Sequence, residues 1–290
     1  MEPLGIIGLV VGIVGAVFAY LQWNHPKAPK ASETHPPDNG GTLKHVLERR
    51  VLRVGLFRYP PLIDYTETGA SVVATGLYAE LIQDFANRNS LRVEWCPTKL
   101  SDAIPAVTHH EVDCYACIML SDVRYRECDF VGLLHSIAVI GVVRRGEQSV
   151  RHPSDLTNDR NIKIAVCQGE IGHHTASTTL RIPSRRLVEI SACDISEIIA
   201  QVHAGNASVA LADALSCKRM MQTPKAKKNF KLVFADPPIL TVPNGFMVAK
   251  NDKEFSAWLD AGVRRAFSTV DGRKRDAALH CEFGNSITTY

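Results

Sequence analysis

The sequence predicts an α/β fold, because segments with the features of strands alternate with a segment that has the features of a helix. Residues 51–57 (VLRVGLF) are mostly apolar, and residues 91–95 (LRVEW) alternate apolar with charged side chains, as expected of strands. Between them, residues 77–89 carry apolar side chains at helical spacing. The apolar face of this helix comprises Leu77, Leu81, Ile82 and Phe85. Strand–helix–strand order is typical of α/β proteins, and 290 residues suffice for one or two such domains.

The chain opens with a predicted membrane anchor, residues 1–23. Residues 4–21 contain no charged side chain, and 18 such residues are about enough to cross a bilayer core. Tyr20 and Trp23 would then lie at the membrane interface. A cleaved signal peptide is the competing interpretation, but it needs a basic start and an A-x-A-like cleavage site, which Met1-Glu2-Pro3 and the following residues lack. We therefore favour an uncleaved anchor.

Small residues recur along this apolar segment. Gly8 and Gly12 form a GxxxG step that Ala16 continues, and such a row lets two membrane helices approach closely. Self-association of the anchor is therefore one of two open interpretations, since many single-pass helices carry glycine without pairing. Residues 24–42 follow, and their richness in Pro, Gly and polar side chains predicts a linker.

The residues alone do not decide on which side of the membrane the soluble part lies. His25, Lys27 and Lys30 follow the apolar segment, and the positive-inside rule then favours the cytoplasm. Eight cysteines without paired spacing also suit a reducing compartment. The net charge of +3 is small, so nothing predicts a nucleic-acid partner.

The rest of the chain is organised around residues 111–130. Residues 114–120 form a short apolar run that predicts a buried strand, and Ser121-Asp122 then offer a helix N-cap. Arg124 falls in the first helical turn, where negative charge is usually preferred. A cation beside outward-pointing backbone N–H groups suits a bound carboxylate, but this stretch alone favours a solvated surface arginine.

Metal and catalytic motifs are weak. Cys114 and Cys117 have CxxC spacing, but no second pair follows, and on a regular strand the two side chains would face opposite sides. His109-His110 and His173-His174 are adjacent pairs whose side chains diverge. No phosphate-binding loop, dinucleotide-binding fingerprint or G-x-S-x-G motif occurs. We therefore predict no metal and no cofactor.

The second half of the chain repeats the alternation of strands and helices. The predicted strands are residues 139–144, 162–166, 231–234 and 245–249, and the predicted helices are residues 195–203 and 255–267. Asp213 precedes Ala214-Leu215 and is a candidate helix N-cap.

Several of these motifs resemble extracytoplasmic solute-binding proteins of family 3, which bind amino acids. The matching segments, in chain order, are residues 51–62 (VLRVGLFRYPPL), 104–107 (IPAV), 112–113 (VD), 121–130 (SDVRYRECDF), 153–156 (PSDL), 166–170 (VCQGE), 205–213 (GNASVALAD), 245–249 (GFMVA) and 271–284. The resemblance therefore covers roughly residues 43–285. It implies an extracytoplasmic soluble part, against the two observations above.

The fold implied by the resemblance is the two-lobe periplasmic-binding-protein type II fold, preceded here by one transmembrane helix. Lobe 1 would comprise residues 43–137 and 243–285, and lobe 2 residues 138–242, with a small-molecule ligand between them. The family's roles fall on Arg124 for a ligand carboxylate, Asp213 for its ammonium and Tyr59 over its side chain. The other implied ligand-contacting positions are Cys117, Met119, Ser121 and Glu170.

The match departs from the family at three places. Glu170 stands where the family has Ser or Thr, and its charge competes with an anionic ligand. Cys117 and Met119 replace small hydroxyl residues.

The two possible roles of Arg124 predict different contacts. An arginine that faces a ligand in an open cleft would have no partner within the protein. A structural role predicts instead an ion pair with Asp122, Glu127 or Asp129.

The function implied is binding of an amino acid or related small polar ligand, with a transporter permease or a signalling protein as partner. Cyclohexadienyl dehydratases share this fold, so a dehydratase-type enzyme is the competing hypothesis. Its general acid would be Glu170 or Asp213.

Overall fold

The computed structural model of the protein describes residues 41–69, 71–191 and 194–290. The predicted anchor helix, residues 4–21, lies outside these ranges, as does nearly all of the predicted linker. Within the ranges described, no helix combines the length and apolar character that crossing a membrane requires.

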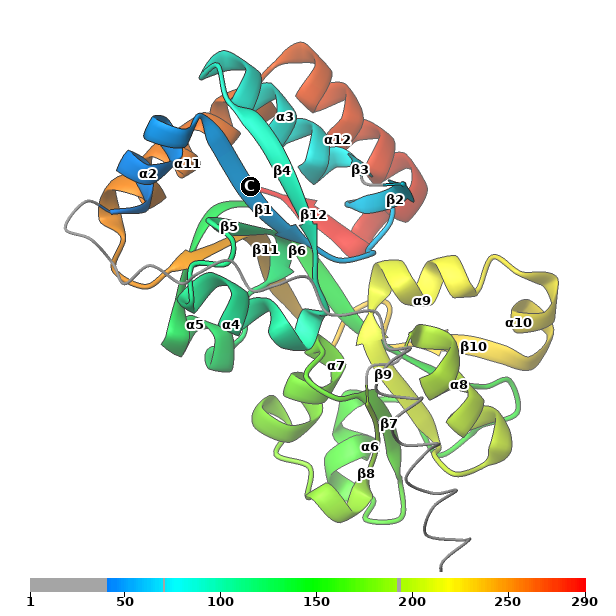
Figure 1. The fold of residues 1–290 in the computed structure, drawn as a ribbon. Helices are drawn as coiled ribbons and strands as arrows, with labels where there is room; N and C mark the ends of the chain where they lie inside the picture. The colour runs from blue at the N-terminus through cyan, green and yellow to red at the C-terminus, as the bar shows by residue number, and fades with distance from the viewer. Residues whose placement is uncertain (1–40, 70, 192–193) are drawn as a thin grey trace, which may run out of the picture. The chain divides into compact units, whose positions relative to one another are not determined.

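The first lobe contains the beginning and the end of the described chain (Figure 1). Its elements are α2 (Thr42–Arg49), β1 (Val51–Leu56), β2 (Asp64–Thr68), β3 (Ser71–Thr75), α3 (Leu77–Arg88), β4 (Arg92–Pro97), a 3₁₀ turn (Leu100–Asp102), α4 (Ala103–Thr108), β5 (Cys114–Met119), α5 (Asp122–Glu127), α11 (Lys253–Phe267), α12 (Val270–Phe283), a 3₁₀ turn (Gly284–Ser286) and β12 (Ile287–Thr289). The helix α3 follows the sequence expectation closely, and its buried face includes Leu77, Leu81, Ile82 and Phe85.

The second lobe is formed by the middle of the chain. Its elements are α6 (Pro153–Asn158), β7 (Ile164–Cys167), α7 (Ile171–His174), a π-helical turn (Thr175–Thr179), a 3₁₀ turn (Ser184–Arg186), β8 (Leu187–Ile190), α8 (Ile195–Ala204), β9 (Val209–Asp213), α9 (Ala214–Met220), α10 (Pro224–Asn229) and β10 (Phe230–Val233).

The long strand β6 (Cys128–Arg144) runs through both lobes, because it pairs with β11 (Leu240–Ala249) in the first lobe and with β9 and β10 in the second. The strand order along the sheet is β4-β1-β5-β11-β6-β9-β7-β8, and β10 and β12 also pair with β6. The first-lobe strands β4, β1 and β5 are parallel, as are β9, β7 and β8 in the second lobe. Both lobes therefore direct the carboxyl ends of parallel strands, where α/β proteins bind ligands, toward their junction.

Each lobe buries apolar side chains on both faces of its sheet. In the first lobe, α3, α11 and α12 cover one face and α4 covers the other. In the second lobe, α8 and α9 cover one face, and α6 and the π-helical turn cover the other. The sequence alternation of strands and helices thus gave the correct class, α/β.

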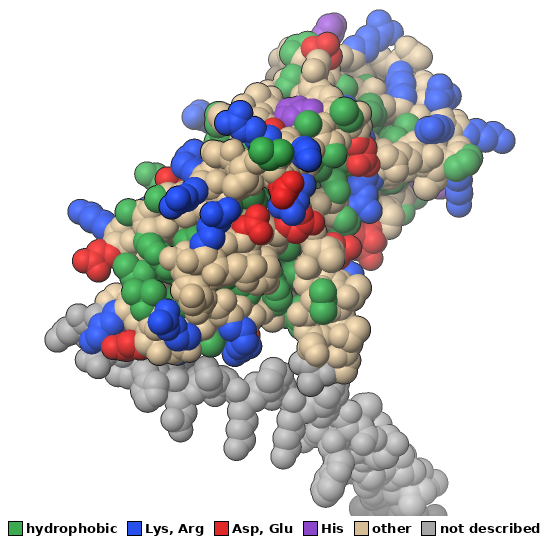
Figure 2. Space-filling model, turned by 90° about the horizontal axis from the view of Figure 1, so that it is seen from above, with side chains coloured by type: hydrophobic (Ala, Val, Ile, Leu, Met, Phe, Trp, Pro, Cys, Tyr) green, Lys and Arg blue, Asp and Glu red, His purple; other side chains and the backbone are tan. Residues whose placement is uncertain are grey.

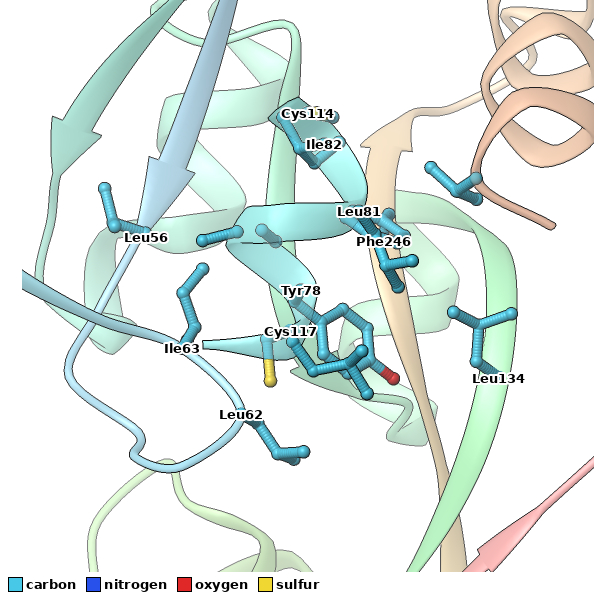
Figure 3. Close-up of a cluster of buried hydrophobic side chains, with 14 of the residues drawn as sticks. Leu56, Leu62, Ile63, Tyr78, Leu81, Ile82, Cys114, Cys117, Leu134 and Phe246 are labelled. Carbon is cyan, nitrogen blue, oxygen red and sulfur yellow. The ribbon is translucent and has the colours of Figure 1, made fainter. Parts of the chain in front are cut away.

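A polar cluster is enclosed within the first-lobe core. The Tyr78 hydroxyl lies 3.1 Å from Nδ1 of His135, whose Nε2 lies 3.0 Å from Asp276. The same hydroxyl is 3.1 Å from the carbonyl oxygen of Asn244. Figure 3 shows Tyr78 and Cys117 among the aliphatic side chains of this core. The cluster satisfies polar groups of β6 and β11 that would otherwise be buried without partners.

The structure corrects one expectation about β5. Cys114 and Cys117 belong to the same buried cluster, together with Ala116, so they do not face opposite sides. The register with β11 shifts between Gly245 and Met247, and the backbone φ of Cys117 is +59°. This irregularity of the β-bulge type interrupts the strand's alternation and turns Cys117 onto the face that Ala116 already occupies.

The strand predicted at residues 139–144 is only the last third of β6, which begins at Cys128. The chain also continues as a strand beyond residue 285, because β12 pairs with β6 in the register Ile287↔Ile137.

Candidate ligand-binding site

A cleft of about 770 Å³ is lined by side chains from both lobes. The first lobe contributes the segment after β1, the end of β5 and the start of α5, and the second contributes the turn after β7, the start of α8 and the end of β9. The volume is typical of sites for small ligands. Of the seven residues predicted from the sequence to contact a ligand, six line this cleft: Tyr59, Cys117, Met119, Arg124, Glu170 and Asp213.

Arg124 is held in the cleft by backbone oxygens. Ser121 caps α5 by accepting a hydrogen bond from the Arg124 backbone N–H, as the sequence predicted, which places Arg124 in the first turns. Its guanidinium donates to the carbonyl of Met119 at 2.8 Å and, across the cleft, to the carbonyl of Gly169 at 3.2 Å. The side chain is buried, and no ion pair joins it to another described residue.

Both sequence expectations for Arg124 therefore need correction. The ion pair expected from a structural role is not formed, because Asp129 pairs with Lys250 at 2.8 Å instead. The residue is not without internal partners either, since it has two carbonyl acceptors. These acceptors are uncharged, so the positive charge of Arg124 is not neutralised by its contacts. Burial lowers the pKa of the guanidinium, and the nearby Glu170 opposes this effect.

Asp213 ends β9 and caps α9, which confirms the predicted N-cap. Its Oδ1 accepts from the backbone N–H of Ser216 at 2.8 Å and from the Tyr59 hydroxyl at 2.7 Å. Tyr59 comes from the first lobe, so this second hydrogen bond crosses the cleft. Both side chains are buried, and burial together with the Asp213 carboxylate holds the pKa of the Tyr59 phenol well above its usual value. The phenol therefore remains a donor to Asp213.

Glu170 lies at the N-terminus of α7, on the sharp turn that follows β7. Gly169 makes this turn possible with a φ of +78°, a conformation that glycine adopts without strain. Gly172, in α7, packs so closely on β9 that an added Cβ would lie 2.0 Å from the carbonyl oxygen of Leu211. This close packing fixes Glu170 relative to the strand that ends in Asp213.

The environment of Glu170 favours its protonated form. Burial is the largest cause, and the facing Asp213 carboxylate adds to it, so the pKa of Glu170 rises to about 7 despite the opposing effect of Arg124. The side chain is half-buried in the cleft. Glu170 can therefore hold or release a proton near neutral pH.

Cys117 and Met119 line the cleft, whereas Ser121 does not. The thiol of Cys117 accepts from the Asn244 side-chain amide at 3.4 Å, and burial raises its pKa far above that of an exposed thiol. This thiol is consequently unreactive toward nucleophilic chemistry. The Ser121 hydroxyl instead caps α5 and borders a separate, smaller pocket of about 110 Å³.

Other cleft residues were not predicted from the sequence as site residues. Phe57 stacks on Tyr59 with ring centroids 5.7 Å apart, and its position at the end of a strand was the only available signal. Arg219, in α9, donates to the carbonyl of Pro60 in the opposite lobe. Nearby, Lys218 donates to the carbonyl of Phe283 at 2.5 Å, which adds another hydrogen bond between the lobes. Such contacts pair a side chain with a distant backbone group and leave no local sequence pattern.

The described residues contain no group of three or more His, Cys, Asp or Glu side chains that could hold a metal ion. The face drawn in Figure 2 carries acidic and basic side chains interspersed with one another. Away from its exposed rim, the cleft offers the guanidinium of Arg124, the carboxyl groups of Glu170 and Asp213, and aromatic surface.

Comparison with known proteins identifies the family. A family model described as bacterial extracellular solute-binding proteins, family 3, matches residues 52–271. The chain belongs to this family. The resemblance read from the sequence motifs is thus confirmed, and the fold is the periplasmic-binding-protein fold of amino-acid-binding proteins. A search of curated protein sequences finds no match.

Solved structures of low sequence identity share this fold. An ancestral amino-acid-binding protein, a precursor of cyclohexadienyl dehydratase, is 20% identical, with a TM-score of 0.65 over 84% of this chain and all of that one. A histidine kinase sensor domain similar to periplasmic binding proteins is 22% identical, with a TM-score of 0.67 over 79% of this chain and 95% of that one. A solute receptor for L-cysteine from Neisseria gonorrhoeae is 16% identical, with a TM-score of 0.67 over 84% and 96%.

Proposed function

We propose that this family member binds an amino acid or a closely related small polar ligand in the cleft between its lobes. The observation that carries the proposal is the meeting of Arg124, from the first lobe, with Asp213 and Glu170, from the second, in one cleft. In this proposal Arg124 holds a ligand carboxylate, Asp213 holds an ammonium group, and Tyr59 covers the ligand. Cys117 and Met119 form an apolar part of the cleft wall.

We also propose that residues 1–23 anchor the protein to the membrane, with the binding lobes on the extracytoplasmic side. Family membership supports the side, and the uncharged run of residues 4–21 supports the anchor. The partner would then be a transporter permease or a membrane signalling protein that recognises the liganded lobes. Co-purification of the full chain from membranes, with and without ligand, would identify which class of partner it meets.

Thermal-shift screening of refolded, ligand-stripped protein tests the binding proposal. The panel should contain the standard amino acids, polyamines and keto acids. A ligand present at 100 times its Kd adds about 2.7 kcal/mol to the free energy of unfolding. For a protein of this size, that free energy corresponds to a rise in melting temperature of roughly 5–10 °C. If no compound in the panel raises the melting temperature, the proposed binding function is wrong.

A dehydratase-type reaction is the second candidate, and one observation favours it. The pKa of Glu170 rises to about 7, which suits a general acid that donates a proton to a leaving hydroxyl group near neutral pH. Incubation with prephenate or arogenate, compared with the Glu170→Gln variant, tests this reaction. Release of no keto acid or aromatic amino acid by the unmodified protein would exclude it.

A further inference from the structure

Two carboxyl groups of the second lobe lie side by side at the ends of neighbouring strands. β7 and β9 are adjacent and parallel, in the register Ala165↔Ala210. Glu170 follows the end of β7 and Asp213 ends β9, and both line the cleft. The charge of Asp213 raises the pKa of Glu170. The charge of Glu170 in turn raises the pKa of Tyr59, the phenol that donates a hydrogen bond to Asp213.

The charges enclosed in the cleft do not balance. Arg124 contributes one positive charge, and Glu170 and Asp213 contribute two negative charges when ionised, which leaves a net charge of −1. Among the described residues, none of the three forms an ion pair: Arg124 donates to two carbonyls, and Asp213 accepts from a hydroxyl and a backbone N–H. An uncompensated charge in a buried site is costly.

The charged groups at the rim of the cleft do not remove this imbalance. Arg58, Lys99, Asp194 and Arg219 are exposed, so water and salt screen their effect on the interior. Arg58 is, in addition, already paired with Asp64 at 3.0 Å. The compensating charge must therefore come from a proton or from the ligand.

We propose, resting on the solute-binding function above, that the ligand is a small organic cation of net charge +1 whose positively charged groups are held by Glu170 and Asp213. An α-amino acid with a cationic side chain fits this charge balance if its carboxylate reaches Arg124. A diamine without a carboxylate fits it less well, because its two ammonium groups would leave the cleft with a net charge of +1. Glu170 is then the residue that selects a cation over an uncharged analogue, because it supplies the second negative charge.

A neutral amino acid in the same cleft requires Glu170 to be protonated, whereas a cationic ligand requires it to be ionised. Its carboxylate on Arg124 would lie near Glu170, which must then be protonated to avoid repulsion. A cationic ligand instead favours ionised Glu170 and displaces its proton. Affinity for a cation should consequently rise as the pH increases through about 7, the pKa of Glu170, whereas affinity for a neutral amino acid should fall.

The groups facing Glu170 are consistent with this assignment of the pH effect. Asp213 faces it from β9, Arg124 from α5, and Tyr59 from the segment after β1. On its own helix, His173 accepts from the Gly169 backbone N–H through Nδ1 and has Nε2 3.6 Å from Glu189. Burial lowers the pKa of the next residue, His174, to about 4, so that imidazole is neutral throughout the relevant range.

Calorimetric titration of the full chain with near-isosteric ligand pairs tests the inference. L-Arginine and L-citrulline have similar shapes but differ by one positive charge, and cadaverine is lysine without its carboxylate. At pH 8 we expect L-arginine or L-lysine to bind at least tenfold more tightly than L-citrulline. Glu170→Gln should reduce that ratio to below about threefold. The control Glu197→Gln, an exposed position of α8 outside the cleft, should leave the ratio unchanged.

The outcomes separate this inference from the function on which it rests. L-Lysine should bind more tightly than cadaverine, which lacks the carboxylate for Arg124 and carries two positive charges; cadaverine binding as tightly as L-lysine would contradict the charge balance. Equal affinities for L-arginine and L-citrulline in the unmodified protein would overturn the inference but leave solute binding intact. Failure of every amino acid and diamine to bind a cooperatively melting protein would overturn both. The unmodified protein also provides a test that needs no variant, since affinity for the cation that falls between pH 6 and pH 8 contradicts proton displacement.

Discussion

Replacing Asp213 by Asn would remove one buried negative charge while retaining the shape of the side chain. Asn is as good an N-cap as Asp, so the hydrogen bond from Ser216 to residue 213 should persist and α9 should remain intact. A charge-assisted hydrogen bond from a ligand ammonium contributes about 1.5–3 kcal/mol. Loss of that contribution corresponds to roughly 10–150-fold weaker binding.

Isothermal titration with the ligand found by screening measures this change. The matched control is Asp252→Asn, which removes the same charge from the N-cap of α11, outside the cleft. We expect the control to bind ligand with unchanged affinity, and both variants to melt within a few degrees of the unmodified protein. If Asp213→Asn binds within threefold of the unmodified protein, Asp213 does not hold the ligand and the reasoning above fails.

Three further changes have predictable results. Arg124→Lys should weaken ligand binding at least about tenfold and, because it also loses two carbonyl contacts, lower the melting temperature of the ligand-free protein; unchanged melting would contradict the observed contacts. Half-buried His174, with a pKa of about 4, stays neutral in the fold, whereas the unfolded chain takes up a proton below about pH 6.5. The fold therefore loses stability as the pH falls from 6.5 to 4, and chemical denaturation should show a smaller loss for His174→Gln. Gly172→Ala would force a Cβ against the Leu211 carbonyl and should destabilise the protein by about 1–3 kcal/mol, while Gly146→Ala, at a position with no atom within 4 Å, should not.

The parts of the fold that the sequence predicted are those with local patterns. Helix α3 has a regular apolar face, and the Asp213 cap needs only a carboxylate three residues before a backbone N–H. The part of β6 before residue 139 was missed because polar residues interrupt its apolar pattern. His135 is one of these, and its partners Tyr78 and Asp276 are 57 and 141 residues away in the sequence. No local signal can reveal such a pairing.

The same limit applies to the candidate site. The resemblance to family 3 solute-binding proteins brought Arg124 and Asp213 into one prediction, and both line the cleft. The hydrogen bond from Tyr59 to Asp213 joins residues 154 positions apart, and it depends on how the lobes meet rather than on either segment. The orientation of Cys117 depends on an irregularity in strand pairing that a regular strand pattern cannot express.

The hydrogen bonds between the lobes have a consequence for what a partner protein would detect. Three of them run from a side chain of one lobe to a backbone carbonyl of the other. Arg124 donates to Gly169, Arg219 to Pro60 and Lys218 to Phe283. In the ligand-free protein they lower the free energy of the arrangement described here, in which hydrogen bonds join the lobes and which we call closed. A larger closed fraction before binding raises the apparent affinity, because less of the binding energy is spent on closure. A partner that recognises closed lobes would then also respond to part of the ligand-free protein. The difference between its responses to liganded and ligand-free protein would therefore shrink as the closed fraction, and with it the apparent affinity, increases.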